Sequence, residues 1–153
     1  MRWFERISQQ REPDFYIGGK EKPYCRRWWV IPRNRWFNIY LHNFMRSDED
    51  RALHDHPWLN FSYILEGSYF EWTIKAGGVR KRVEYKKGDW QFRSARLAHR
   101  LEIVPGETSW SLFITGPVMR TWGFHCENSV GWRPWKEFVD STDLGGIGKG
   151  CDP

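Results

Sequence analysis

The stretch HDHPWLN, residues 54–60, is the most informative part of this 153-residue sequence. It holds two of the five histidines in the chain, His54 and His56, separated by one residue. Side chains two residues apart on an extended segment point to the same side, so this spacing suits chelation of a metal ion. Trp58 and Asn60 share that parity. The predicted face therefore carries two imidazoles, an indole and an amide.

A third histidine, His99, lies on a later segment with alternating polarity. Leu101 and Ile103 share its parity, whereas Arg100 and Glu102 point the other way. This pattern predicts that His99 lies on the buried face of a half-exposed strand. Three neutral imidazoles meeting inside a barrel would bind Fe, Zn, Ni, Cu or Mn and would leave coordination positions open to a ligand.

The composition favours an all-β protein. Aromatic residues make up 18%, including eleven Trp, beside fourteen Gly and eight Pro, a mixture typical of twisted strands and tight turns. Aromatic and β-branched runs separated by turn residues predict strands over residues 27–31, 36–44, 60–65, 68–75, 79–85, 99–104, 110–115 and 121–124. Many short strands at regular spacing are typical of a sandwich or a small barrel.

The histidines lie in two motifs that resemble those of the cupin superfamily. The first motif is His54-x-His56-x3-Asn60-x6-Gly67, and the second is Gly88-x5-Ser94-x-Arg96-x2-His99. The intervening residues, 68–87, leave room for the strand-turn-strand that cupins have there. The resemblance covers about residues 36–124. It implies a double-stranded β-helix, the cupin jelly-roll barrel, with a metal site in the barrel mouth.

The resemblance also implies a ligand set. It assigns His54, His56 and His99 to the three histidine-ligand positions, and Asn60 stands where the family usually has a metal-binding Glu. The resulting three-His site is similar to that of thiol dioxygenases in the superfamily. Because neutral imidazoles leave the metal its full charge, an anionic or thiolate substrate would be favoured. Asn60 would then donate a hydrogen bond to the bound group, or its presence marks a site that binds metal weakly or not at all.

Two further candidates precede the first motif. Residues 36–42 alternate between two faces, and either face can point inward. If the even face lines the pocket, Tyr40 and His42 are substrate contacts or an acid/base pair; otherwise His42 is a surface or hydrogen-bonded histidine. Together with Trp58 as a pocket wall and Asn60, they form the predicted substrate-binding set, and no catalytic residue is assigned.

Charged residues surround both motifs. Asp55, between the two motif histidines, should face away from them and pair with an arginine. Arg93, Arg96 and Arg100 cluster around the second motif, where one of them could hold a substrate carboxylate in a bidentate pair. Alternation turns Arg100 away from the metal, so its neighbours are the better candidates.

We expect three segments: residues 1–25 form an N-terminal extension that packs on the barrel, residues 26–126 form the barrel, and residues 127–153 form an irregular tail with a mobile, Gly-rich end. Trp3, Phe4 and Ile7 have helical spacing, which predicts a short docking helix in the first segment.

Charge and cysteine content bear on partners and location. The net charge of +5 is spread without a block of five like charges, so nucleic-acid binding is disfavoured. Cys25, Cys126 and Cys151 are odd in number and lack a C-x-x-C pair, which argues against a disulfide framework and a cysteine-built zinc site. Without an apolar run long enough for a signal peptide or membrane span, we expect a cytoplasmic protein. Cupins often form dimers, so the resemblance also implies that this protein forms a homodimer.

The function implied by the resemblance is that of a metal-binding cupin, specifically an Fe-dependent dioxygenase acting on a small anionic or thiol substrate. Zn, Ni, Mn and Cu are alternatives to iron. A non-catalytic cupin that binds a small molecule is one rival. A metal-dependent isomerase or epimerase, with His42 or Tyr40 as the base, is another, and a nucleic-acid-binding barrel ranks last.

Overall fold

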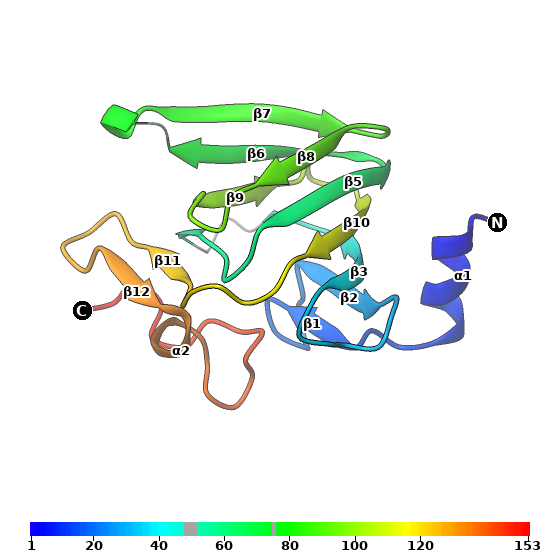
Figure 1. The fold of residues 1–153 in the computed structure, drawn as a ribbon, viewed down its shortest axis with the longest axis horizontal. Helices are drawn as coiled ribbons and strands as arrows, with labels where there is room; N and C mark the ends of the chain where they lie inside the picture. Colours follow the sequence, from blue (N-terminus) through cyan, green and yellow to red (C-terminus); the bar gives the residue numbers. More distant parts are fainter. Residues whose placement is uncertain (48–51, 75) are drawn as a thin grey trace.

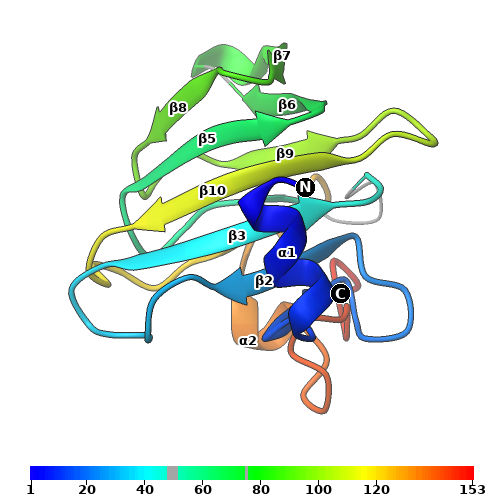
Figure 2. The same cartoon turned by 90° about the vertical axis from the view of Figure 1, so that its right-hand side faces the viewer.

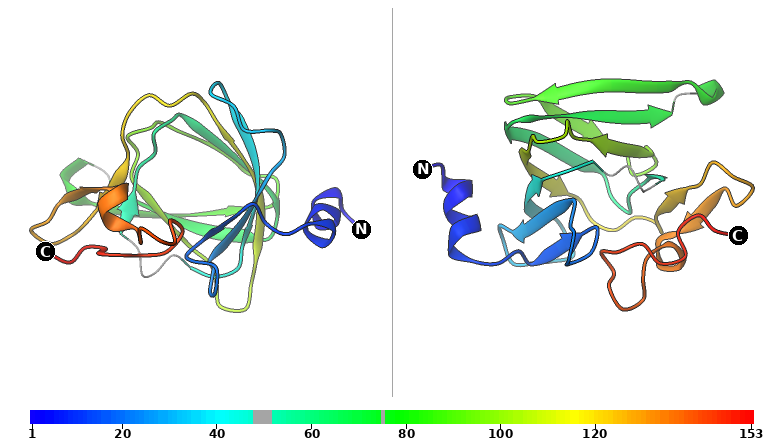
Figure 3. Two further views of the ribbon diagram at one scale, coloured as in Figure 1. Left: turned by 90° about the horizontal axis from the view of Figure 1, so that it is seen from below. Right: turned by 180° about the vertical axis from the view of Figure 1, so that it is seen from behind.

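The strands of this chain form two antiparallel sheets. The computed structural model describes residues 1–47, 52–74 and 76–153. The first sheet has the strand order β1 (Phe15–Ile17), β2 (Cys25–Trp29), β3 (Asn38–Phe44), β10 (Ser109–Thr115), β5 (Asn60–Glu66) and β8 (Trp90–Arg93). The second has the order β12 (Trp132–Pro134), β11 (Gly123–His125), β4 (Leu53–His54), β9 (His99–Glu102), β6 (Ser68–Ile74) and β7 (Arg80–Lys86). The sheets curve around a common axis (Figure 1; Figure 3, left).

This architecture confirms the predicted jelly-roll fold class. Each of the eight strand ranges expected from the sequence overlaps a strand, although residue 75, the end of the expected range 68–75, lies outside the described residues. The strands that the sequence did not predict, β1, β4, β8 and β12, are only two to four residues long. Such short strands carry too few residues for alternation to be recognised.

The inner faces of the barrel are partly polar. Along β10 the buried positions are Ser109, Ser111, Phe113 and Thr115, so three of these four inward side chains carry a hydroxyl. An apolar cluster fills one part of the interior and consists of Tyr24, Cys25, Phe44, Ile64, Tyr69, Leu101 and Ile103. Buried polar side chains need hydrogen-bond partners, and their concentration inside a barrel indicates a binding site.

The N-terminal helix α1 (Trp3–Gln10) packs against the outer face of the first sheet, as Figure 2 shows. Phe4 is only 3% exposed and joins Trp28 and Leu41 in a buried cluster. Its ring lies 5.3 Å from that of Trp110. Trp3, in contrast, is 44% exposed, so the apolar side of the helix is centred on Phe4.

The tail is tied to the barrel by a disulfide between Cys126 and Cys151, with the two Cα atoms 5.6 Å apart. The sequence-based argument against a disulfide was therefore wrong. The odd cysteine count misled it, because the buried Cys25 takes no part in the disulfide and the other two cysteines pair across 25 residues of sequence. Disulfides persist mainly in oxidising compartments, so the cysteine content no longer supports the predicted cytoplasmic location.

The Gly-rich end of the tail packs closely against other backbone segments. A Cβ at Gly145 would lie 1.9 Å from the carbonyl oxygen of Tyr16, so only glycine fits there. The amides of Gly148 and Gly150 both donate to the carbonyl of Phe138, the last residue of the short helix α2 (Trp135–Phe138). The predicted mobility of this end and the division into three segments stay predictions.

A 3-10 turn, Ala76–Gly78, precedes β7. Within the described part of the chain, neither α1 nor α2 is long and apolar enough to cross a membrane.

Candidate metal centre

The three motif histidines meet inside the barrel. His54 on β4 lies directly opposite His99 on β9 in the register of the second sheet. His56 follows β4, and its amide donates to the carbonyl of Ala95 at 3.1 Å. One ring nitrogen from each histidine falls within 4.8 Å of the others, and Nε2 of His56 lies 2.9 Å from Nε2 of His99. The sequence-predicted set is thus brought together.

Burial favours the neutral form of two of these imidazoles, those of His56 and His99. It lowers the pKa of His56 well below its usual value, and the neighbouring His99 and His54 lower that pKa further. Burial also lowers the pKa of His99, against the opposing effect of Glu71. Because the neutral ring is the form that ligates a metal, the donor set fits a divalent transition ion.

A buried carboxylate, which the sequence analysis missed, orients His99. Glu71 on β6 is 2% exposed, and its Oε1 contacts Nδ1 of His99. This contact places the proton on Nδ1 and leaves the lone pair on Nε2, the atom that faces His56. Burial alone would raise the pKa of Glu71, but His99 and Arg93 outweigh it and the pKa falls to about 2.

Arg93 on β8 balances the charge of Glu71. Its Nε donates to Glu71 Oε1 at 2.6 Å, and it is 1% exposed. The same guanidinium donates to Ser62 Oγ at 2.8 Å and to Asn60 Oδ1 at 3.2 Å. From the sequence, Arg93 was one candidate for holding a substrate carboxylate, but its charge is already paired with the carboxylate of Glu71.

The predicted substrate-binding residues occupy different places. A cavity of about 290 Å³ is lined by Tyr40, Trp58, His54 and His56, among others. His42 lines a smaller cavity of about 50 Å³, and all three motif histidines line the same cavity. Asn60 lines neither of these two cavities, and its amide oxygen is directed at Arg93.

His42 and Tyr40 lie on the even face of β3, and each lines one of these cavities, so their role as substrate contacts or as an acid/base pair stays a prediction. The even face of β3 points inward, so Tyr40 and His42 are both buried. Nε2 of His42 accepts a hydrogen bond from Nε of Arg27 at 2.8 Å. Burial and the Arg27 cation hold the pKa of His42 well below its usual value, so the ring is neutral.

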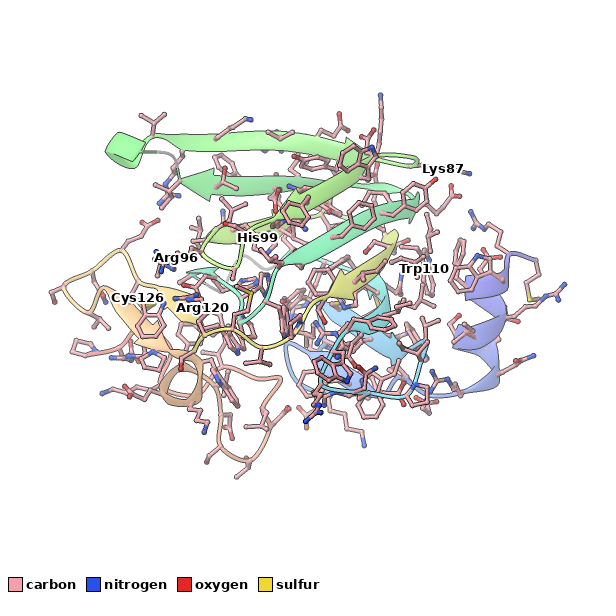
Figure 4. The ribbon with its side chains drawn as sticks, viewed as in Figure 1. Lys87, Arg96, His99, Trp110, Arg120 and Cys126 are labelled. Atoms are coloured by element: carbon pink, nitrogen blue, oxygen red, sulfur yellow. A yellow bond between two sulfur atoms is a disulfide. The ribbon has the colours of Figure 1, made fainter. Side chains whose placement is uncertain are left out.

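Asp55 faces away from the metal centre and pairs with an arginine, as predicted. Its Oδ1 lies 3.0 Å from Nη1 of Arg120 and accepts the amide of Gly123 at 2.9 Å. Its Oδ2 accepts hydrogen bonds from His125 at 3.0 Å and Trp132 at 3.1 Å. Asp55 therefore anchors the histidine loop to β11 and β12. Figure 4 shows Arg120 and His99 at the end of the barrel that lies away from Lys87.

The two curved sheets and the three-His centre define a cupin fold with a site that can hold a divalent metal ion. A structure of the Mn(II) enzyme oxalate decarboxylase from Bacillus subtilis is 18% identical over 76% of this chain and 30% of its own, with a TM-score of 0.54. A structure of Fe(II) HppE is 15% identical over 69% of this chain and 58% of its own, with a TM-score of 0.53.

A formate complex of oxalate decarboxylase from Lactobacillus farciminis is 14% identical over 71% of this chain and 33% of its own, with a TM-score of 0.53. This chain thus spans less than two thirds of each of these proteins, and the likeness is one of fold. No protein-family model matches the sequence. No curated protein matches it either.

Proposed function

We propose that the protein binds one divalent transition metal ion through His54, His56 and His99 and uses it to oxidise a small anionic or thiol substrate with O2. The observation that carries the metal site is the convergence of three imidazoles inside the barrel, with burial lowering the pKa of His56 and of His99. Two similar folds, described with Mn(II) and Fe(II), support a divalent metal, and iron suits the dioxygenase reaction best.

A metal held there would supply Lewis acidity and open coordination positions for substrate and O2. The residues of the chain have separate tasks around it. Glu71 holds the proton on Nδ1 of His99 and so fixes the ring. Arg93 neutralises Glu71, which allows a carboxylate to stay charged in the interior. Trp58 stacks on His56 with ring centroids 5.2 Å apart and limits the access of water.

The test is elemental analysis of protein purified without a His tag or chelators. We expect about one equivalent of metal in the parent, as for other three-His centres. A His54→Ala/His99→Ala double variant should be folded by circular dichroism and metal-free. Arg82→Ala is the control, because Arg82 forms an exposed ion pair with Glu102 outside the cluster. A folded parent that takes up no metal after anaerobic reconstitution, or a double variant that keeps it, would contradict the proposal.

The reaction needs its own test. We expect the Fe(II)-loaded protein to consume O2 in the presence of one member of a panel of small thiols and carboxylates, and the double variant to consume none. Turnover without O2 uptake would favour the isomerase alternative. A loaded protein that binds a panel member without turnover would favour a non-catalytic binding cupin. The homodimer and the cytoplasmic location stay predictions.

A further inference from the structure

The cavity of about 290 Å³ beside His54 and His56 has features that metal binding does not require. It is lined by two arginines, Arg27 and Arg33, and by several aromatic side chains. Its volume lies at the lower end of the range for ligand pockets, roughly 300–1,000 Å³, which limits the occupant to a small molecule.

Arg27 is a half-buried cation without an acidic partner among the described residues. It lies on β2 opposite His42 and lines the cavity. Its Nε donates to the neutral His42 at 2.8 Å, and its guanidinium lies 4.8 Å from the centroid of the Tyr40 ring. Burial lowers its pKa, as expected for a cation whose charge is not compensated. Its terminal nitrogens make no hydrogen bond to a residue that the structure describes.

Arg33 adds a second cation to the same cavity. It lies in the loop between β2 and β3, and its guanidinium is 5.3 Å from the centroid of the Trp29 ring. Two guanidinium groups that share a cavity repel each other unless an anion lies between them. Guanidinium groups bind carboxylates by paired hydrogen bonds, so this end of the cavity suits a carboxylate.

Most of the other side chains that line the cavity are aromatic. Trp122 and Trp135 are stacked with ring centroids 5.8 Å apart and an interplanar angle of 9°, and Trp58 stacks on His56. From the tail, Val139 and Leu144 also line the cavity. Aromatic walls favour a ligand with a planar apolar ring, because stacked and edge-to-face contacts add to the burial of its surface.

We propose that this cavity binds a small aromatic carboxylate, with its carboxylate held by Arg27 and Arg33 and its ring packed against the aromatic lining next to His54 and His56. The inference deepens the proposed function, because it names the ligand class of the same site. Arg27 and Arg33 are then the residues that determine specificity for an anion.

The test uses phenylacetate as a probe in calorimetric titrations of metal-free and Zn-loaded protein. Phenethylamine carries the same ring with the opposite charge, and acetate carries the carboxylate without the ring. We expect phenylacetate to bind more tightly than either. Arg27→Gln and Arg33→Gln should each weaken its binding about tenfold or more, since a hydrogen bond to a charged group is lost. Arg27→Lys should recover part of the affinity.

Arg26→Gln is the matched control. Arg26 precedes Arg27 on β2 but is exposed on the other face, so binding should not change. If Arg27→Gln does not fold, the exposed Arg33 still provides the test. The inference is overturned if folded Arg27→Gln or Arg33→Gln binds phenylacetate as the parent does. It is also overturned if phenethylamine or acetate binds as tightly as phenylacetate, or if the folded parent does not bind phenylacetate.

Metal analysis of the same samples separates the two proposals. One equivalent of metal in a protein that does not bind phenylacetate would reject the aromatic carboxylate and keep the metal site. Arginine-dependent binding of phenylacetate by a protein that takes up no metal would reject the metal site and keep the anion cavity.

Discussion

Glu71 on β6 contacts Nδ1 of His99 on the neighbouring strand β9, and this contact directs Nε2 of the same ring at His56, 2.9 Å away. A buried carboxylate in this position serves the metal centre in two ways. It fixes one tautomer of the imidazole, and it raises the basicity of the nitrogen that would bind the metal. Arg93 makes the arrangement electrically neutral, so the interior carries a charge pair rather than a bare anion.

Replacing Glu71 with Gln should weaken metal binding with little change of shape. Because the side chain loses its charge, His99 loses the partner that orients and polarises it, and we expect the affinity for Zn²⁺ or Co²⁺ to fall about 10–100-fold. The measurement is a competition titration against a chromophoric chelator. The buried Arg93 would be left without its partner, which should lower the free energy of unfolding by about 3 kcal/mol.

Glu102→Gln is the control for this change. Glu102 lies on β9 as His99 does, but it points outward and pairs with Arg82 at 2.6 Å. The metal affinity of this variant should equal that of the parent. Its free energy of unfolding should lie within about 1 kcal/mol of the parent's, because exposed ion pairs contribute little to stability. Equal metal affinity of the Glu71 and Glu102 variants would show that Glu71 has no role at the centre.

The histidine centre could be predicted from the sequence because its signals are local. His54 and His56 are two residues apart, and the alternation around His99 identifies a buried strand face. Glu71 lacked such a signal. On β6 the other face carries Phe70 and Trp72, which look like core residues, yet the structure buries Tyr69 and Glu71 and leaves Phe70 and Trp72 partly exposed.

The arginine cavity and the disulfide depend on contacts that a single sequence does not reveal. Arg26 and Arg27 form one basic pair in the sequence, and only the pairing of β2 with β3 shows that Arg27 lies opposite His42 inside the barrel. Cys126 and Cys151 meet because the tail folds back after α2. No periodic pattern in the Gly-rich tail indicates that course.

The docking of α1 can be tested on two adjacent residues. Phe4 is 3% exposed and Trp3 is 44% exposed. Phe4→Ala should lower the free energy of unfolding by about 3 kcal/mol, because it leaves a cavity between the helix and the first sheet. Trp3→Ala should cost less than about 1 kcal/mol, as is usual for an exposed position. Urea denaturation measures both, and equal losses would contradict the observed orientation of the helix.

Asp55 should stabilise the loop that carries two of the histidines. In Asp55→Ala the amide of Gly123 and the indole N–H of Trp132 lose their acceptor, and we expect a loss of about 3 kcal/mol in unfolding free energy. Metal affinity should fall as well, because His54 and His56 flank this anchor. Glu127→Ala removes a carboxylate that is mostly exposed, and it should change neither quantity. A stable Asp55→Ala protein with the parent's affinity would show that the loop is held by other contacts.

The disulfide should affect both stability and ligand binding, since the segment that it ties down contributes Trp135, Val139 and Leu144 to the cavity wall. Removing a cross-link that spans 25 residues of sequence lets the unfolded chain expand, so Cys126→Ser/Cys151→Ser should lose about 3 kcal/mol of unfolding free energy. The looser wall should weaken phenylacetate binding, whereas metal stoichiometry should stay the same because the three histidines lie outside the tail. Dithiothreitol should reproduce these effects in the parent and have no effect on the double variant. If the reduced parent binds phenylacetate as tightly as the oxidised one, packing and not the disulfide holds the tail against the barrel. One such packing contact is that between Phe124 and Phe138, whose ring centroids lie 3.7 Å apart.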